Sequence, residues 1–164
     1  MATSDIALTT LGVKVCYCLT NPTIATSAQK ADLVWIKDIK STPALNPETE
    51  ALDATTLRET EFKKYAQGLK DLGGSLEFTS NYTEKLETTW GTFYSATTGA
   101  STKKDGYIVI VHPDLENASV IPCQPQKLGL PEMGTNAILE AKPRVTPTGE
   151  ISRVTKENMD IPTE

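Results

Sequence analysis

Residues 35–82 read WIKDIKSTPALNPETEALDATTLRETEFKKYAQGLKDLGGSLEFTSNY, and this stretch decides the fold. Near its end, Leu76 and Phe78 alternate with polar residues, which is the period of a strand with one buried and one polar face. The residues around its start follow the same period. The sequence therefore predicts a strand at each end of the stretch, over residues 32–40 and 75–82.

Between these strands, residues 40–72 contain too few apolar positions to build a core of their own. Pro43 and Pro47 open this polar arm, and the LDATTL run at 52–57 is threonine-rich and prone to form a strand. Gly73 and its neighbour Gly74 turn the chain into the next strand. An arm of this kind is either disordered or ordered by a neighbouring molecule.

The sequence predicts one helix, beginning after the N-cap Thr83 and stopping at Gly99. Its apolar residues recur at positions i, i+4, i+7 and i+8: Leu86, Trp90, Phe93 and Tyr94. This spacing gives one apolar stripe, which we interpret as a helix face packed on a sheet rather than as a ligand-binding surface.

Five further strands are predicted, over residues 11–19, 107–111, 120–123, 136–145 and 150–154. The run YIVIV at 107–111 is apolar on both faces and indicates a central strand. Pro122 and Pro125 mark their strand as an edge or a bulged one, and the turn at 146–149 makes the last strand a hairpin partner of the preceding one. The predicted fold class is mainly β: an antiparallel β-sandwich or partly closed barrel of seven or eight strands with a flanking helix.

The length of 164 residues fits one domain, which we assign to residues 1–154, with 40–72 as its arm and 155–164 as a flexible C-terminal tail. No run of about 18 apolar residues occurs, so we expect no membrane contact. Asp5 and Lys14 break the pattern of a signal peptide. The net charge of -5, without a basic patch, argues against a protein that grips nucleic acid.

Catalytic chemistry has little support. His112 is the only histidine, and we interpret its His-Pro-Asp triplet as a turn that ends a strand. The cysteines at 16, 18 and 123 read as buried structural residues, because one histidine and one distant cysteine are a poor supply of metal ligands. No phosphate-binding loop occurs. We therefore expect no catalytic residues, no metal and no cofactor, and we do not expect an enzyme.

The order and spacing of several short runs carry a family resemblance. Trp35-Ile36 precedes Pro43 and Leu45; LDATTL follows with Arg58-Glu59-Thr60; then come Tyr65, Gly68-Leu69-Lys70-Asp71 and Gly74-Ser75-Leu76-Glu77-Phe78. This stretch, about a third of the chain, resembles the major tail protein, or tail tube protein, of long-tailed non-contractile phages. The family has no catalytic signature.

The resemblance implies a β-sandwich with a flanking helix that assembles into hexameric rings, which stack into the virion tail tube. Its implied partners are further copies of itself, the tape-measure protein, the tail terminator, tail-tip proteins and DNA that passes without specific binding. The implied place of assembly is the bacterial host cytoplasm. A carboxylate-lined lumen suits this function, because it repels DNA phosphates instead of binding them.

We assign candidate site residues on this basis. The apolar and polar contacts between subunits or rings are expected at Leu45, Leu52, Thr55, Leu57, Phe62, Tyr65 and Leu69. The alternative for Phe62, Tyr65 and Leu69 is that they pack under their own domain. The carboxylates expected to face the lumen or an interface are Asp53, Glu59, Glu61 and Glu77.

Two alternatives stay open at this point. A tube component of a contractile tail, a phage-derived bacteriocin or a secretion system would share the fold, and composition does not separate it from a non-contractile tail protein. A monomeric immunoglobulin-like binding module would also fit a β-sandwich of this length.

Overall fold

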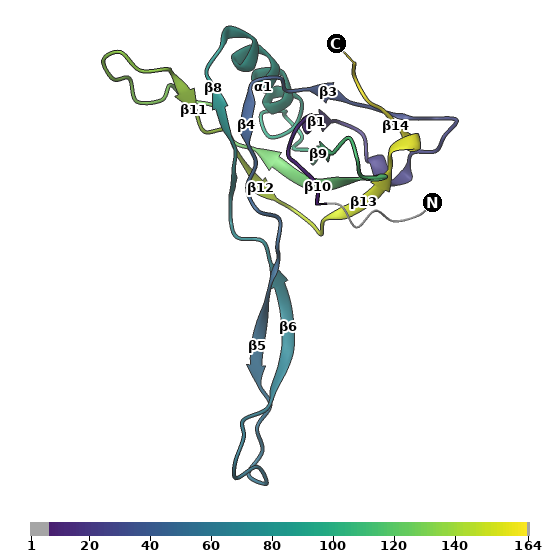
Figure 1. Ribbon diagram of the computed structural model, residues 1–164, viewed down its shortest axis with the longest axis vertical. Coiled ribbons are helices and arrows are strands. Elements are labelled where there is room, and N and C mark those ends of the chain that lie inside the picture. Colours follow the sequence, from purple (N-terminus) through teal and green to yellow (C-terminus); the bar gives the residue numbers. More distant parts are fainter. Residues whose placement is uncertain (1–6, 164) are drawn as a thin grey trace.

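The computed structural model describes residues 7–163, so residues 1–6 and 164 of the predicted domain and tail lie outside it. The chain forms a body of strands with one helix, and a long hairpin arm that extends from the body along the longest axis of the molecule (Figure 1). No helix in the described range is long and apolar enough to cross a membrane.

The body is built on one seven-stranded antiparallel sheet. Its order is β3 (Val34–Trp35), β1 (Lys14–Cys18), β9 (Gly106–Val111), β10 (Asn117–Pro125), β12 (Arg144–Pro147) and β7 (Leu76–Glu77), and β13 (Ser152–Thr155) also pairs with β10. The prediction of a mainly β, antiparallel fold is confirmed. The sheets formed by residues 7–163 are open and do not close into a barrel.

Strand β9 lies at the centre of this sheet, as the apolar YIVIV run predicts. Ile108 packs into a core on the side of the helix, whereas Val109 packs into a second core on the other side. Strand β1 divides its side chains in the same way, with Tyr17 in the helix-side core and Cys16 in the second. The sheet is therefore buried on both faces, which fits a central strand without polar positions.

Helix α1 (Glu84–Ala96) covers one face of the sheet (Figure 1). It begins as predicted, because the Thr83 hydroxyl accepts a hydrogen bond from the Leu86 backbone N–H at 3.1 Å. Leu86, Trp90 and Phe93 are fully buried. The Phe93 ring stacks on Tyr17, with 4.6 Å between ring centroids. Three of the four residues of the predicted stripe therefore hold the helix on the sheet, whereas Tyr94 is half-buried.

Two smaller sheets flank this core. A three-stranded sheet has the order β11 (Glu140–Ala141), β8 (Thr79–Asn81) and β4 (Ile39–Ser41). A parallel pair joins β2 (Ala31–Asp32) to β14 (Met159–Asp160), close to the short 3-10 helices η1 (Pro22–Ile24) and η2 (Lys156–Asn158) in the sequence. A flexible tail was expected over residues 155–164. The structure differs at Met159, which is buried in the second core and pairs with Ala31.

Several predicted strands are shorter or differently paired. The strand predicted over 32–40 is divided into pieces of β2, β3 and β4, the one over 75–82 into β7 and β8, and the one over 136–145 into β11 and the start of β12. The strand carrying Pro122 is central rather than an edge. Strand β10 pairs with β13 up to Val120 and with β12 from Cys123, so Pro122 lies where one partner replaces the other. The predicted hairpin partner at 150–154 pairs with β10 instead of β12.

Candidate assembly interface

The arm is a two-stranded antiparallel hairpin of β5 (Glu48–Asp53) and β6 (Tyr65–Asp71). Its residues are exposed on both faces; Gly68, the one exception, is half-buried. The register shifts between Thr49 and Ala51, so that one residue of β5 faces two of β6. Such a β-bulge increases the local twist of the hairpin. The polar arm is therefore folded, and only the first two residues of the LDATTL run lie in a strand.

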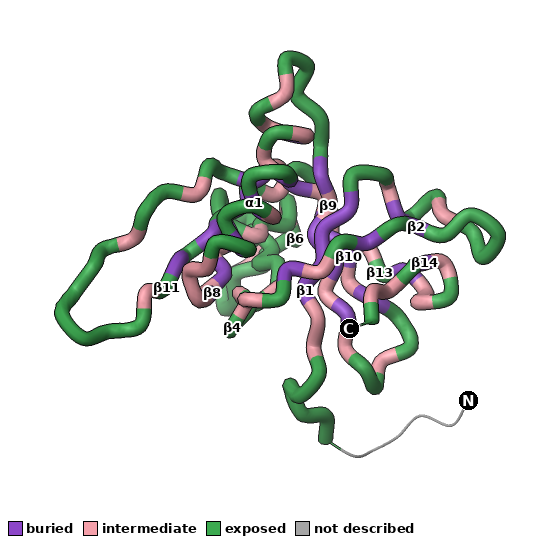
Figure 2. Tube along the Cα trace, turned by 90° about the horizontal axis from the view of Figure 1, so that it is seen from above, coloured by how far each residue is buried: buried purple, intermediate pink, exposed green. Residues whose placement is uncertain are grey.

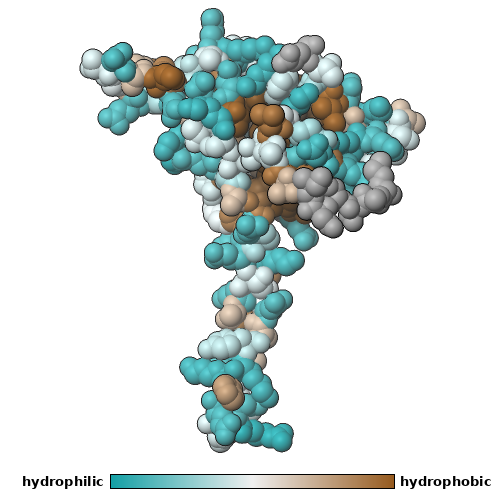
Figure 3. Space-filling view, in the orientation of Figure 1, coloured by the Kyte–Doolittle hydropathy of each residue, from teal (hydrophilic) through white to brown (hydrophobic). Residues whose placement is uncertain are grey.

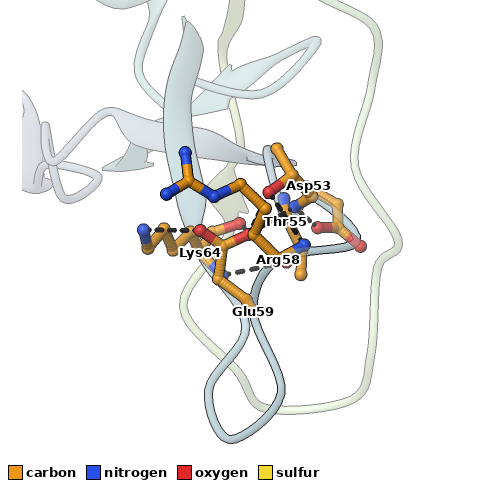
Figure 4. A network of polar contacts seen from close by, with 6 residues as sticks. Asp53, Thr55, Arg58, Glu59 and Lys64 are labelled. Carbon is orange, nitrogen blue, oxygen red and sulfur yellow. Dashed lines mark hydrogen bonds and ion pairs between the residues drawn. The ribbon is translucent and has the colours of Figure 1, made fainter.

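The tip of the arm is closed by backbone and side-chain hydrogen bonds (Figure 4). Ala54 N donates to Lys64 O at 2.8 Å, and Lys64 N donates back to the Thr55 hydroxyl at 2.9 Å. Thr55 N also donates to Asp53 Oδ1 at 2.9 Å. These short-range bonds satisfy backbone groups that the hairpin ladder no longer pairs.

Glu59 is the centre of this tip network (Figure 4). Its carboxylate lies 2.7 Å from Lys64 Nζ and accepts from both the backbone N–H, at 2.7 Å, and the hydroxyl of Thr56. The bond to Lys64, followed by the bonds to Thr56, lowers the pKa of Glu59 from 4.5 to about 2. The loop 54–64 is therefore held in one shape by charged and polar contacts rather than by apolar packing.

The apolar side chains of the arm have no core to enter. Five of the predicted contact residues are exposed, to the following fractions: Leu52 46%, Leu57 104%, Phe62 80%, Tyr65 61% and Leu69 83%. The alternative in which Phe62, Tyr65 and Leu69 pack under their own domain is therefore wrong. Burial of large apolar side chains is worth about 1.5–3 kcal/mol each, so this surface is costly unless another molecule covers it.

Two predicted contact residues lie in different surroundings. Leu45 is half-buried and packs against the helix-side core at the root of the arm. Thr55 is half-buried within the tip network. A groove of about 1000 Å³ runs along the root, and Leu45, Leu69, Leu72, Pro147 and Ile151 form its apolar lining.

The four predicted carboxylates are not alike. Glu77, on β7, pairs with Arg144 at 2.7 Å and with Lys142 at 3.5 Å, and Glu59 pairs with Lys64. Asp53 and Glu61 are exposed and form no ion pair within the described range. Hydrogen bonds from Thr55 lower the pKa of Asp53.

A second projection, the loop 126–139 between β10 and β11, was not predicted from the sequence. It leaves the body on one side (Figure 1), and three of its large apolar side chains are exposed: Leu130 72%, Met133 63% and Ile138 77%. Because residues 136–145 were predicted to form a strand, the end of this loop was assigned to that strand. The sequence signal is a cluster of apolar residues without helical or strand spacing, interrupted by Gly129, Pro131 and Gly134.

His112 and the three cysteines have structural roles in the body. His112 Nδ1 accepts from Asp114 N at 3.1 Å, which makes the predicted turn after β9. The cysteines are buried, as predicted, and burial raises the pKa of the Cys16 and Cys123 thiols to about 12. Within residues 7–163 no three of the His, Cys, Asp and Glu side chains are grouped so that they could hold a metal ion.

The fold is shared with chains of tail-like particles. A chain of the anti-feeding prophage (AFP) baseplate, 6-fold symmetrised, has a TM-score of 0.57 at 12% identity, over 94% of this chain and 98% of that one. A chain from the tail of the empty GTA particle, refined with C6 symmetry, has a TM-score of 0.56 at 12% identity, over 86% and 96%. A chain of the anti-feeding prophage cap, the AFP tube terminating cap, has a TM-score of 0.55 at 8% identity, over 94% and 96%.

No family model and no curated protein matches the sequence. The likeness therefore rests on the course of the backbone, which these chains share with this one across almost their whole lengths. This chain therefore shares its fold with these chains of tail-like particles.

Proposed function

We propose that this chain is a structural protein of a phage-type tail, whose copies form rings that stack into a tube. The observation that carries the proposal is the folded arm. It extends far from the body and exposes Leu57 and Phe62 at its tip, and within residues 7–163 its two strands pair only with each other (Figure 1). An isolated two-stranded hairpin is marginal in water, so an arm of this kind suits contact with another molecule.

In this proposal the arm of each copy contacts the next ring, and Leu52, Leu57, Phe62, Tyr65 and Leu69 enter that contact. Leu45 and Thr55 position the root and the tip. The stacking contact joins different surfaces of identical chains, as a head-to-tail assembly requires. A ring of six is the expected symmetry, since two of the similar chains come from assemblies described as 6-fold symmetrised or refined with C6 symmetry.

The tube would provide a channel for DNA during ejection, within the virion tail of a non-contractile phage. Asp53 and Glu61 are the stronger candidates for carboxylates that face the lumen, because Glu59 and Glu77 already have cationic partners. Uncompensated carboxylates repel DNA phosphates within about 10 Å at ordinary ionic strength. Tape-measure, terminator and tail-tip proteins are the expected partners, and the host cytoplasm is the expected place of assembly.

A second reading has two forms. In the first, the chain is a component present in one ring, such as a baseplate or cap protein. In the second, it is a tube protein of a contractile tail, bacteriocin or secretion system. The likeness to chains from a baseplate and from a terminating cap supports this reading equally. Under the tube reading we expect tubes of variable length from the purified chain, and under the baseplate or cap reading we expect single rings. A monomeric binding module would form neither.

The test is negative-stain electron microscopy of the purified chain, together with sedimentation velocity at several concentrations. The variant Leu57→Asp/Phe62→Asp is compared with Thr88→Asp/Thr92→Asp, which adds the same charge on the exposed face of α1. We expect tubes from the wild type and from the helix variant, and single rings that do not stack from the arm variant. Tubes from the arm variant would show that the arm is not the stacking contact.

A further inference from the structure

We infer that the loop 126–139 is the contact by which each copy joins its neighbour within a ring, and that its partner is the opposite end of a second copy. This inference rests on the proposed function and deepens it. It assigns the lateral contact to a segment separate from the arm, and it names a complementary surface on the neighbouring chain.

The loop is anchored at both ends and free between them. Gln126 is fixed twice, since its N–H donates to Arg144 O at 2.9 Å and its carbonyl accepts from Trp90 Nε1 at 2.8 Å. At the other end, Leu139 O accepts from Tyr82 N at 2.9 Å. Leu128 packs against the helix-side core. Both ends of the loop are therefore fixed to the body.

The free part of the loop is apolar where it meets water. Leu130, Met133 and Ile138 are each more than 60% exposed, and brown, hydrophobic side chains stand out on this projection in the space-filling view (Figure 3). Loops of this length without secondary structure are uncommon in compact domains and usually serve binding. Three exposed large apolar residues on one projection favour a protein contact there.

The direction of the loop differs from that of the arm. The arm follows the longest axis of the molecule, whereas the loop leaves the body sideways, next to β11 (Figures 1 and 2). If the arm connects one ring to the next, its direction is close to that of the tube axis. The loop then lies across the tube axis, and because its exposed apolar side chains are unfavourable toward a water-filled channel or the outer surface, we place them against the adjacent copy.

A closed ring of identical chains needs two different lateral surfaces on each copy. The side of the body opposite the loop holds β2 and β14 (Figures 1 and 2) and the chain that leads to β2 from the end of β1. That chain exposes Leu19 by 48% and Ile24 by 78%. We name Leu19 and Ile24 the opposite-end patch, and it is the surface that receives the loop.

The experiment separates the lateral contact from stacking by using Leu57→Asp/Phe62→Asp as a common background. In this background we compare Met133→Asp/Ile138→Asp, which disables the loop, with Leu19→Asp/Ile24→Asp, which disables the opposite-end patch. All four substituted residues are exposed in the single chain, so circular dichroism should show folded variants. Sedimentation velocity at several concentrations measures the average mass.

A head-to-tail contact makes one specific prediction. Each disabled variant alone should stay monomeric, whereas an equal mixture should approach twice the monomer mass, because one intact loop and one intact patch remain in each mixed pair. If the loop variant forms rings as the background does, or if the mixture stays monomeric, the inference fails and the proposed function stands. If the wild-type chain forms neither rings nor tubes at any concentration, the proposed function fails and the inference fails with it.

Discussion

The body and the arm are both built from antiparallel strands, yet they are stabilised by different interactions. The body places apolar side chains on both faces of its sheet, with Trp90 and Phe93 from the helix buried on one of them. The arm buries no residue completely and closes its tip with an ion pair and hydrogen bonds around Glu59.

This difference suggests a division of tasks. A sheet with two cores gains its stability within one chain, so it forms a scaffold of fixed shape. A hairpin without a core keeps its apolar side chains available for another molecule. Substitutions in the two regions should therefore separate folding from assembly, and the following experiments test that separation.

The largest effect is expected from Phe93→Ala. Phe93 is fully buried, stacks on Tyr17 and meets Trp90 edge-on at 5.7 Å. Its truncation should lower the free energy of unfolding by about 3–5 kcal/mol, measured by urea denaturation with circular dichroism. The matched variant Leu57→Ala on the arm should change it by less than about 0.5 kcal/mol. Similar losses in both variants would mean that the arm belongs to the folding unit of the body.

The next effect is expected from Gly106→Ala, at the start of β9. An added Cβ would lie 2.4 Å from Phe93 Cε2 and 3.0 Å from Thr97 Cγ2, and both side chains are buried. The resulting overpacking should cost about 1–3 kcal/mol of unfolding free energy. Gly134→Ala is the control, because nothing lies within 4 Å of its added Cβ. Equal stability of the two variants would contradict the close packing of the helix on β9.

A smaller effect on the body is expected when the arm is removed. Replacing residues 48–71 by a short Gly-Ser linker should change the free energy of unfolding by less than about 1 kcal/mol, because closing a loop of different length costs little. The same variant should form no tubes in electron micrographs. A body that unfolds without the arm would show that the groove at the arm's root, which includes Leu69, contributes to the core.

The smallest effect is confined to the tip of the arm. The pKa of Glu59 is about 2 in the folded arm and about 4.5 without its partners, so its contribution to tip stability is present above pH 4.5 and is lost as the pH falls toward 2. Carboxyl chemical shifts measured by NMR against pH report this titration. Lys64→Ala should move the midpoint upward, whereas Lys63→Ala, which removes a neighbouring cation without a bond to Glu59, should leave it near 2. An unchanged midpoint in Lys64→Ala would rule out the ion pair in solution.

The sequence predicts the parts of the fold that local pattern controls. The N-cap at Thr83, the buried stripe of α1 and the central position of β9 follow from the spacing of polar and apolar residues alone. Pairing between distant strands does not follow from spacing, which is why Pro122 suggested an edge or a bulged strand. The change of partner from β13 to β12 around that residue depends on tertiary structure.

The candidate site shows the same limit. The polar composition of residues 40–72 predicts an arm, but it does not predict the hairpin, whose strands pair Leu52 with Ala66 across the loop 54–64. Nothing in the sequence shows that Glu59 binds Thr56 and Lys64. Charged residues in such a run usually point into solvent without specific partners. The exposure of the loop 126–139 was hidden because apolar residues in a sequence are expected to be buried.

The burial of the three cysteines gives the molecule a natural reporter of its own unfolding. Alkylating reagents attack the thiolate, and a thiol with a pKa of about 12 holds only about one part in ten thousand in that form at pH 8. Cys16 and Cys123 therefore react only after the sheet opens and water reaches them. Because the arm contains no cysteine, the rate of labelling should record the opening of the body alone and stay unchanged while the arm fluctuates, docks or is cut away.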